Sequence, residues 1–142
     1  MKAIVLDTSA VIKWFVKGEE ELEEMKLVRD LLLNSGVEIY VPSSLLIEVS
    51  NALRYIEGLD GEDVIKAVNA LKKLGLWIVD TVELLEDAIK IAFESDITVY
   101  DAIYVALARR IRGFLITYDR ALLSKHRDLA MKASVFLKHM PR

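Results

Sequence analysis

The most constraining feature of this sequence is an alternation between short, continuous apolar runs and longer amphipathic stretches. Residues 3–7 form a run rich in β-branched side chains, the pattern of a strand that is buried on both faces. Similar runs predict further strands at residues 37–41, 76–79, 114–117 and, with a weaker pattern, 133–137. Helical spacing of apolar residues predicts helices at residues 20–33, 43–57, 61–74, 82–95 and 100–111. This order predicts an α/β fold with three layers, α/β/α, around a central parallel sheet of four to five strands.

Composition limits both the size of the fold and its chemistry. The 142 residues make one domain of ordinary size, which we expect to span residues 1–142. Hydrophobic residues are 54% of the chain and there are only 6 Gly and 2 Pro, which excludes a disordered or linker-rich protein. The absence of Cys excludes disulfides, thiolate zinc sites and Cys nucleophiles, and only His126 and His139 could supply imidazole. Any metal ion must therefore be held by oxygen.

Two further features bear on where the protein works. The apolar segment 1–16 is interrupted by Asp7 and does not resemble a signal peptide, and no apolar run reaches the roughly 18 residues of a membrane-spanning helix. We therefore expect a cytoplasmic protein with no membrane partner. The chain lacks Gln as well as Cys and has few Asn, a bias expected where heat makes deamidation and oxidation hazardous, so we also expect a thermophilic source.

Charge is distributed unevenly along the chain. The formal net charge is −3, but residues 1–99 sum to −9 and residues 100–142 to +6. The basic C-terminal third could lie against a polyanion, and Tyr100 and Tyr104 could stack on unpaired bases. An equally good explanation of the basic residues is that cations are favourable at the last turn of a helix. Most of the aromatic residues are more simply explained as core or dimer residues.

Acidic residues follow two of the predicted strands and lie on two of the predicted helices. Asp7 and Asp119 come at strand ends, where open parallel sheets bind ligands, and Asp101 stands at the start of an apolar helix. Asp7 and Asp119 could instead be helix N-caps, and Asp101 could be the acidic member of a capping box opened by Thr98, each such device being worth roughly 0.5–2 kcal/mol. Glu48 lies mid-helix, where no cap is available and a buried, unpaired carboxylate is costly, so its alternative is a solvated face. Asn51 shares its side of that helix.

If these four acids converge, their mutual repulsion favours a divalent cation. Mg²⁺ and Mn²⁺ take oxygen ligands and keep several waters, which suits a few carboxylates without thiolate. Such an ion can activate a water and neutralise the charge that develops on a phosphodiester, so hydrolysis of that bond is the expected chemistry. We expect Ser9, Asn51 and Thr117 to support the acids, although the hydroxyls of Thr8, Ser9 and Thr117 could equally be turn or cap groups.

Four segments that carry these residues follow one another along the chain: Asp7-Thr-Ser, Pro42-Ser-Ser-Leu-Leu-Ile-Glu48-Val-Ser-Asn51, Tyr100-Asp101-Ala-Ile-Tyr-Val-Ala-Leu-Ala108 and Thr117-Tyr-Asp119-Arg-Ala-Leu. In order and spacing they resemble the motifs of PIN domains, in particular the small VapC-type toxins, over nearly the whole chain. The resemblance implies a PIN-like form of the α/β/α fold and a Mg²⁺- or Mn²⁺-dependent endoribonuclease. It makes Asp7, Glu48, Asp101 and Asp119 the catalytic, metal-binding acids. It also implies an RNA substrate, a homodimer and a cognate VapB-type antitoxin.

Two other functions fit the same residues. A PIN-like fold without metal chemistry would be a binding or scaffold protein, and Mg²⁺ or Mn²⁺ would add nothing to its thermal stability. A Mg²⁺-dependent phosphoryl-transfer or receiver-like domain also places acids at the ends of parallel strands. It fits less well, because Asp7 is followed by Thr8 and Ser9 where a second acid is expected. The glycine-rich nucleotide-binding motifs G-x-x-x-x-G-K-[ST] and G-x-G-x-x-G do not occur in the sequence.

Overall fold

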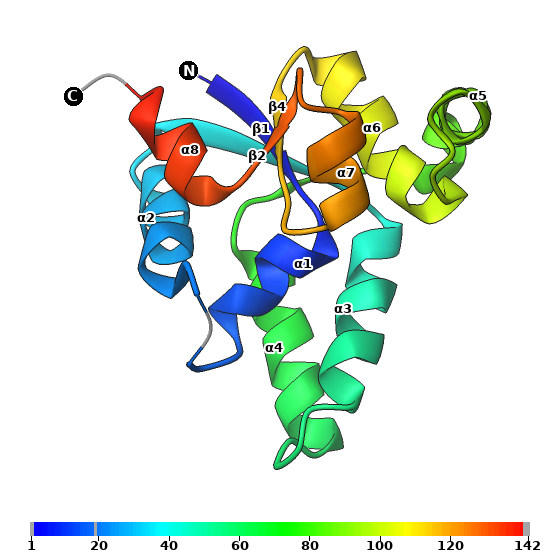
Figure 1. The fold of residues 1–142 in the computed structure, drawn as a ribbon. Helices are drawn as coiled ribbons and strands as arrows, with labels where there is room; N and C mark the ends of the chain where they lie inside the picture. Colours follow the sequence, from blue (N-terminus) through cyan, green and yellow to red (C-terminus); the bar gives the residue numbers. More distant parts are fainter. Residues whose placement is uncertain (1, 19, 141–142) are drawn as a thin grey trace.

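A parallel β-sheet forms the centre of the structure (Figure 1). The computed structural model describes residues 2–18 and 20–140. The strands in these residues are β1 (Lys2–Leu6), β2 (Val37–Pro42), β3 (Trp77–Val79), β4 (Phe114–Ile116) and β5 (Ala130–Met131). Their order across the sheet is β3-β2-β1-β4-β5, and every pair of neighbours is parallel. The predicted α/β fold with a central parallel sheet is therefore confirmed.

Helices cover both faces of this sheet, as Figure 1 shows. They are α1 (Thr8–Val11), the short 3-10 helix η1 (Ile12–Trp14), α2 (Leu22–Leu33), α3 (Ser44–Arg54), α4 (Gly61–Lys73), α5 (Thr81–Ser95), α6 (Val99–Ile111), α7 (Arg120–Lys125) and α8 (Ala133–Lys138). On one face α6 packs against β1 and β2 and carries α5 on its outer side, whereas α2 and α8 pack together on the other face. The pair formed by α3 and α4 extends below the sheet in Figure 1.

Burial explains why the central segments take these forms. Ile4, Val5 and Leu6 of β1 are fully buried, because helices cover both faces of this strand. In α6 all of residues 102–108 are buried, so this helix is enclosed between the sheet and α5. A helix that is apolar on every side is stable only in such a position. Although α6 is apolar, no helix in the described part of the chain is both long and apolar enough to cross a bilayer.

The prediction of a strand at residues 133–137 is wrong. The segment is the helix α8, and the fifth strand is β5 just before it. Ala133 and Phe136, three positions apart, are both buried, which is the spacing of a helix face. The first N–H groups of α8 donate to the Tyr118 hydroxyl (3.2 Å) and to a Glu21 carboxylate oxygen (3.0 Å). Contacts from distant segments thus cap this helix, and they leave no local pattern in the sequence.

The shortest helices were not predicted either. The helices α1 and α7 have only 4 and 6 residues, too few to show an apolar repeat. Each begins at an aspartate that caps it, Asp7 for α1 and Asp119 for α7, as the capping alternative for these acids anticipated. The helix α3 ends at Arg54, before the predicted end at residue 57.

We predict that Gly113→Ala destabilises the protein. Gly113 connects α6 to β4, and a Cβ atom there would overlap the backbone carbonyl of Ala3 in β1. Relieving the overlap requires backbone movement between neighbouring strands, so we expect a loss of about 1–3 kcal/mol in the free energy of unfolding. Gly61→Ala is the matched control, because in the described part of the chain nothing beyond the neighbouring residues and the local helix backbone lies within 4 Å of the added methyl group. Urea unfolding measures both variants, and equal stabilities for the two would contradict the prediction.

Candidate functional site

Asp7 lies where β1 ends and α1 begins, and it is buried, with 4% of the residue exposed. Its Oδ1 accepts hydrogen bonds from the Ser9 hydroxyl (2.6 Å) and from the Ala10 N–H (3.1 Å), the second of which caps α1. Its Oδ2 accepts a hydrogen bond from the Thr117 hydroxyl. Thr117 follows β4, which lies next to β1 in the sheet. Both oxygens of the Asp7 carboxylate therefore have hydroxyl donors.

The same hydroxyl groups fix the segment that follows β4. The Thr117 hydroxyl accepts a hydrogen bond from the Asp119 N–H (3.0 Å), and the Ser9 hydroxyl accepts one from the Tyr118 N–H (2.8 Å). The Asp119 carboxylate in turn caps α7 by accepting from the Leu122 N–H (3.0 Å). The backbone that carries Asp119 is thus tied to the groups that hold Asp7.

Glu48 is a half-buried residue of α3 that binds two hydroxyl groups from other helices. Its Oε2 accepts hydrogen bonds from Thr8 of α1 (2.8 Å) and from Tyr104 of α6 (2.8 Å). Burial raises the pKa of Tyr104 far above its ordinary value, and the charge of Glu48 raises it further, so this hydroxyl keeps its proton as a donor. The Glu48 Oε1 is buried and has no hydrogen-bond partner among the described residues. A buried, unpaired carboxylate oxygen is costly and favours the approach of a positive ligand.

Asp101 is half-buried in the first turn of α6, a helix that is capped by the Thr98 hydroxyl. Burial raises the pKa of the Asp101 carboxyl, and the charges of Asp119 and Glu48 raise it further. Burial likewise raises the pKa of Asp7 to about 6, against hydrogen bonds that lower it, and the charge of Asp101 adds to the increase. The four acids come from four separate segments of the chain, and Asp101 lies close enough to each of the other three for repulsion.

The other residues predicted for the site have different positions. Ser9 and Thr117 contact Asp7, but Asn51 is exposed, and none of the hydrogen bonds found among the described residues involves its side chain. Tyr104, for which the sequence suggested base stacking or a core position, binds Glu48. The signal that could have revealed it is spacing, since Tyr104 is three residues after Asp101 and shares its side of α6.

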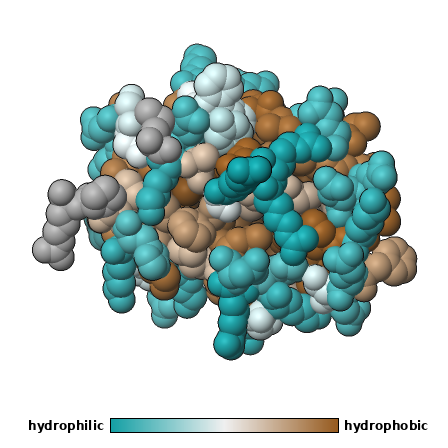
Figure 2. Space-filling view, turned by 90° about the horizontal axis from the view of Figure 1, so that it is seen from above, coloured by the Kyte–Doolittle hydropathy of each residue, from teal (hydrophilic) through white to brown (hydrophobic). Residues whose placement is uncertain are grey.

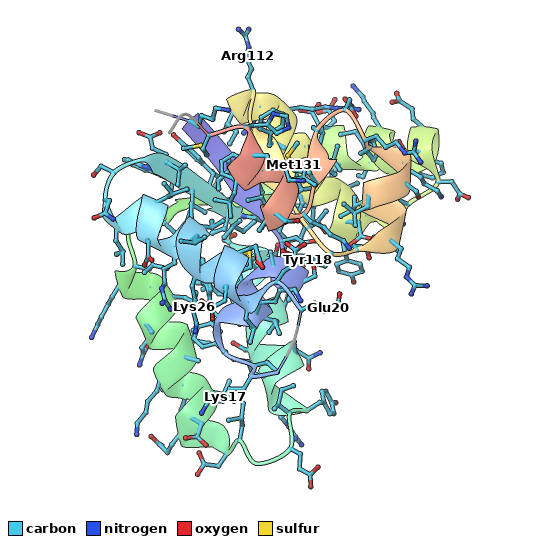
Figure 3. All side chains as sticks on the ribbon, turned by 60° about the vertical axis from the view of Figure 1, so that its left-hand side comes forward. Lys17, Glu20, Lys26, Arg112, Tyr118 and Met131 are labelled. Carbon is cyan, nitrogen blue, oxygen red and sulfur yellow. The ribbon has the colours of Figure 1, made fainter. Side chains whose placement is uncertain are left out.

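A buried cation lies beside the ends of the central strands. Lys13 is 9% exposed, its Nζ donates to the Glu20 carbonyl oxygen (2.8 Å), and it lies 4.4 Å from the centre of the Tyr118 ring. The Tyr118 hydroxyl donates to Glu21 (2.7 Å), and Figure 3 shows Tyr118 beside the segment that carries Glu20. Lys13 is therefore packed into this edge of the fold and is not offered at the surface as a phosphate-binding cation.

The donor set of the site suits a hard cation. Within residues 2–18 and 20–140, no three acidic or imidazole side chains already form a set of metal ligands. Mg²⁺ does not need such a set, because it usually binds through one or two carboxylates and keeps several waters. The unpaired Oε1 of Glu48 and the repulsion centred on Asp101 both fit a cation of this kind.

Comparison with known proteins decides the family. Residues 4–128 match the family described as PIN domain. The chain belongs to the PIN domain family. This PIN domain is 34% identical over 129 residues to Ribonuclease VapC3 from Pyrobaculum aerophilum, an alignment that covers 86% of this chain and 93% of that protein. It is therefore a homologue of the VapC ribonucleases.

Solved structures that share the fold of this PIN domain include two from bacteria. VapC20 from Mycobacterium tuberculosis, described as a sarcin-ricin loop cleaving toxin, has a TM-score of 0.68 and 17% identity, over 85% of this chain and 93% of that one. VapBC2 from Rickettsia felis, bound to a DNA fragment from its promoter, has a TM-score of 0.65 and 13% identity, over 92% of this chain and 98% of that one.

We predict that Asp7→Asn stabilises the metal-free protein at pH 7. The folded-state pKa of Asp7, about 6, is above its unfolded value of 3.8, so folding favours the protonated form. Its contribution to stability is therefore present below pH 4, is lost as the pH rises from about 4 to 6, and reaches about 3 kcal/mol at most. In EDTA we expect the variant to melt above the wild type at pH 7, with a smaller gain at pH 5.

Asp80→Asn is the matched control, since Asp80 is an aspartate that caps α5. Asparagine is an equally good cap, so this variant should melt like the wild type at both pH values. An Asp7→Asn protein that melts below the wild type at pH 7 would show that the hydrogen bonds of the carboxylate outweigh the cost of burying its charge.

Proposed function

We propose that this PIN domain is a divalent-metal-dependent endoribonuclease, acting in the cytoplasm as the toxin of a toxin–antitoxin pair. Asp7, Glu48, Asp101 and Asp119 are its catalytic and metal-binding acids. The observation that carries the proposal is the buried Oε1 of Glu48, which has no hydrogen-bond partner among the described residues, and it is supported by the repulsion between Asp101 and each of the other three acids. Such an arrangement destabilises the protein unless a cation compensates it, so it indicates a binding site.

The acids have unequal roles in this proposal. Glu48 offers the buried Oε1 as a ligand, and Asp101, whose negative charge is opposed by burial and by the charges of Asp119 and Glu48, is a second ligand. Hydroxyl donors hold the Asp7 carboxylate, and a backbone N–H holds that of Asp119. These two acids therefore have fixed positions in the site. When bound, Mg²⁺ or Mn²⁺ lowers the pKa of a water and neutralises the charge that develops on the phosphodiester. All four carboxylates would serve to hold that ion.

RNA is the proposed substrate. The relative at 34% identity is named a ribonuclease, and a structural neighbour is described as cleaving the sarcin-ricin loop. An acidic site repels phosphate unless flanking cations compensate. Arg120, which directly follows Asp119, and Arg127 are exposed on the C-terminal third, where positive charge is concentrated. We propose that these side chains contact the backbone of the RNA, with an affinity that falls as salt rises.

We predict that Asp101→Asn abolishes cleavage of RNA and leaves the fold intact. The purified protein is incubated with total RNA in Mn²⁺ or in EDTA, and the new ends are sequenced. The wild type should cut only with Mn²⁺, and the variant should stay at background. Mn²⁺ at 100 times its dissociation constant should also stabilise the wild type by about 2.7 kcal/mol, and the variant by less.

Asp80→Asn serves again as the control and should cut like the wild type. Cleavage by Asp101→Asn at the wild-type rate would remove Asp101 from the catalytic set. A wild type that Mn²⁺ does not stabilise, and that cuts no RNA, would favour a binding or scaffold protein with this fold.

A VapB-type antitoxin and a second copy of the chain are the proposed protein partners. The antitoxin is supported by the solved VapBC complex that shares this fold, and an acidic site attracts a basic segment of such a partner. The second copy is supported by α5, which is apolar on two sides. Leu84 and Ala88 are among the residues of its buried side, and its exposed side carries Val82, Leu85, Ile89 and Phe93, which we call the α5 surface.

The α5 surface favours pairing with itself. Its four residues recur at three- and four-residue spacing, so they form one continuous stripe, and Phe93 is 86% exposed. Figure 2 shows hydrophobic side chains at the right-hand edge of the molecule, where α5 lies in Figure 1. A two-fold dimer places the same stripe of two chains face to face and removes both from water.

We predict that Phe93→Glu makes the protein monomeric. The charge would have to be buried without a partner in the dimer, which is costly. Size-exclusion chromatography with light scattering should give a dimer for the wild type and a monomer for the variant. Leu33→Glu, an exposed apolar residue of α2, is the control and should remain dimeric. A monomeric wild type would contradict the proposal.

A further inference from the structure

The hydroxyl groups of Thr8 and Tyr104 meet at one oxygen of Glu48. Each lies 2.8 Å from Oε2, and the two hydroxyl oxygens are 3.2 Å apart. The three side chains come from α1, α3 and α6, so these contacts join three helices at the ends of the central strands. Tyr104 is 2% exposed, which excludes stacking of its ring on a substrate base.

The hydroxyl groups of Thr8 and Tyr104 donate to only one of the two Glu48 oxygens. Each hydroxyl has one proton to donate, and each lies within hydrogen-bond distance of Oε2 (2.8 Å) and of the other hydroxyl (3.2 Å). All of the donors in the described structure are therefore on one oxygen of the carboxylate. The other oxygen, Oε1, is buried without a partner. A carboxylate held only as a fold contact would gain from sharing its donors between both oxygens.

The position of Tyr104 adds a second effect. Tyr104 lies three residues after Asp101, on the same side of α6. Its bond to Glu48 therefore holds the side of α6 that carries Asp101 toward α3. Glu48 and Asp101 lie close enough for the charge of Glu48 to act on Asp101. The Tyr104 hydroxyl, through its bond to Glu48, helps to set the distance between them.

We infer that Thr8 and Tyr104 are positioning residues, which hold Oε2 of Glu48 so that Oε1 is presented to the catalytic cation. The inference rests on the proposed function and goes beyond it, since neither residue touches the metal or the RNA in this scheme. Groups that orient a metal ligand through hydrogen bonds typically change metal affinity by about 10- to 100-fold when they are removed. The ring of Tyr104 fills the core, and only its hydroxyl has the positioning role.

The test uses Tyr104→Phe and Thr8→Val, which remove a hydroxyl and keep the shape of the side chain. Calorimetric titration of the metal-free protein with Mn²⁺ measures the dissociation constant, and RNA cleavage gives kcat and KM. We expect each variant to bind Mn²⁺ about 10- to 100-fold more weakly. At saturating Mn²⁺ we expect kcat to be lowered and KM for RNA to be unchanged.

Tyr40→Phe is the matched control, because the Tyr40 hydroxyl donates to Glu38 (3.0 Å) in the same kind of bond. It should leave the affinity for Mn²⁺ unchanged. A merely structural role would lower the melting temperature of Tyr104→Phe and leave its Mn²⁺ affinity at the wild-type value, and that result would overturn the inference alone. A wild type that neither binds Mn²⁺ nor cuts RNA would overturn the proposed function as well. If Tyr104→Phe does not fold, Thr8→Val decides by the same measurement.

Discussion

The hydrogen bonds that hold the Asp7 carboxylate are the interactions on which the rest of the site depends. Burial of this group at the end of the central strand costs free energy, which is why its pKa is raised. Donors from Ser9, Thr117 and the first turn of α1 offset part of that cost. Because Thr117 also binds the Asp119 backbone, the contacts that stabilise the first acid fix where the last one lies.

Capping and site formation are combined in this structure. Asp7 caps α1 through Oδ1 while Oδ2 binds Thr117, and Asp119 caps α7 while its charge acts on Asp101. A carboxylate has two oxygens, so one can satisfy a helix N–H while the other remains available to the site. The two explanations that the sequence left open for these aspartates are therefore compatible.

The sequence predicted what depends on local pattern and missed what depends on distant contacts. The alternation of apolar runs was sufficient for the parallel sheet. The four acids selected from motif order and family resemblance remain a prediction, supported by the repulsion between Asp101 and each of the other three. The helix α8 was predicted as a strand, because its capping groups, Tyr118 and Glu21, lie far away in the chain. The role of Tyr104 was missed for the same reason: its hydroxyl meets a carboxylate 56 positions earlier.

Glu21 connects the helix α8 to the segment that carries the acidic site. Its carboxylate accepts hydrogen bonds from the Tyr118 hydroxyl and from the N–H and hydroxyl of Ser134. Burial opposes the charge on Glu21, but these bonds lower its pKa on balance. Tyr118, which lies between Thr117 and Asp119, is therefore hydrogen-bonded to Glu21 at the start of α2 and to the first N–H of α8. Truncating the chain before α8 would remove the hydrogen bonds of this helix to Tyr118 and Glu21. The segment that carries Asp119 would then be less firmly held.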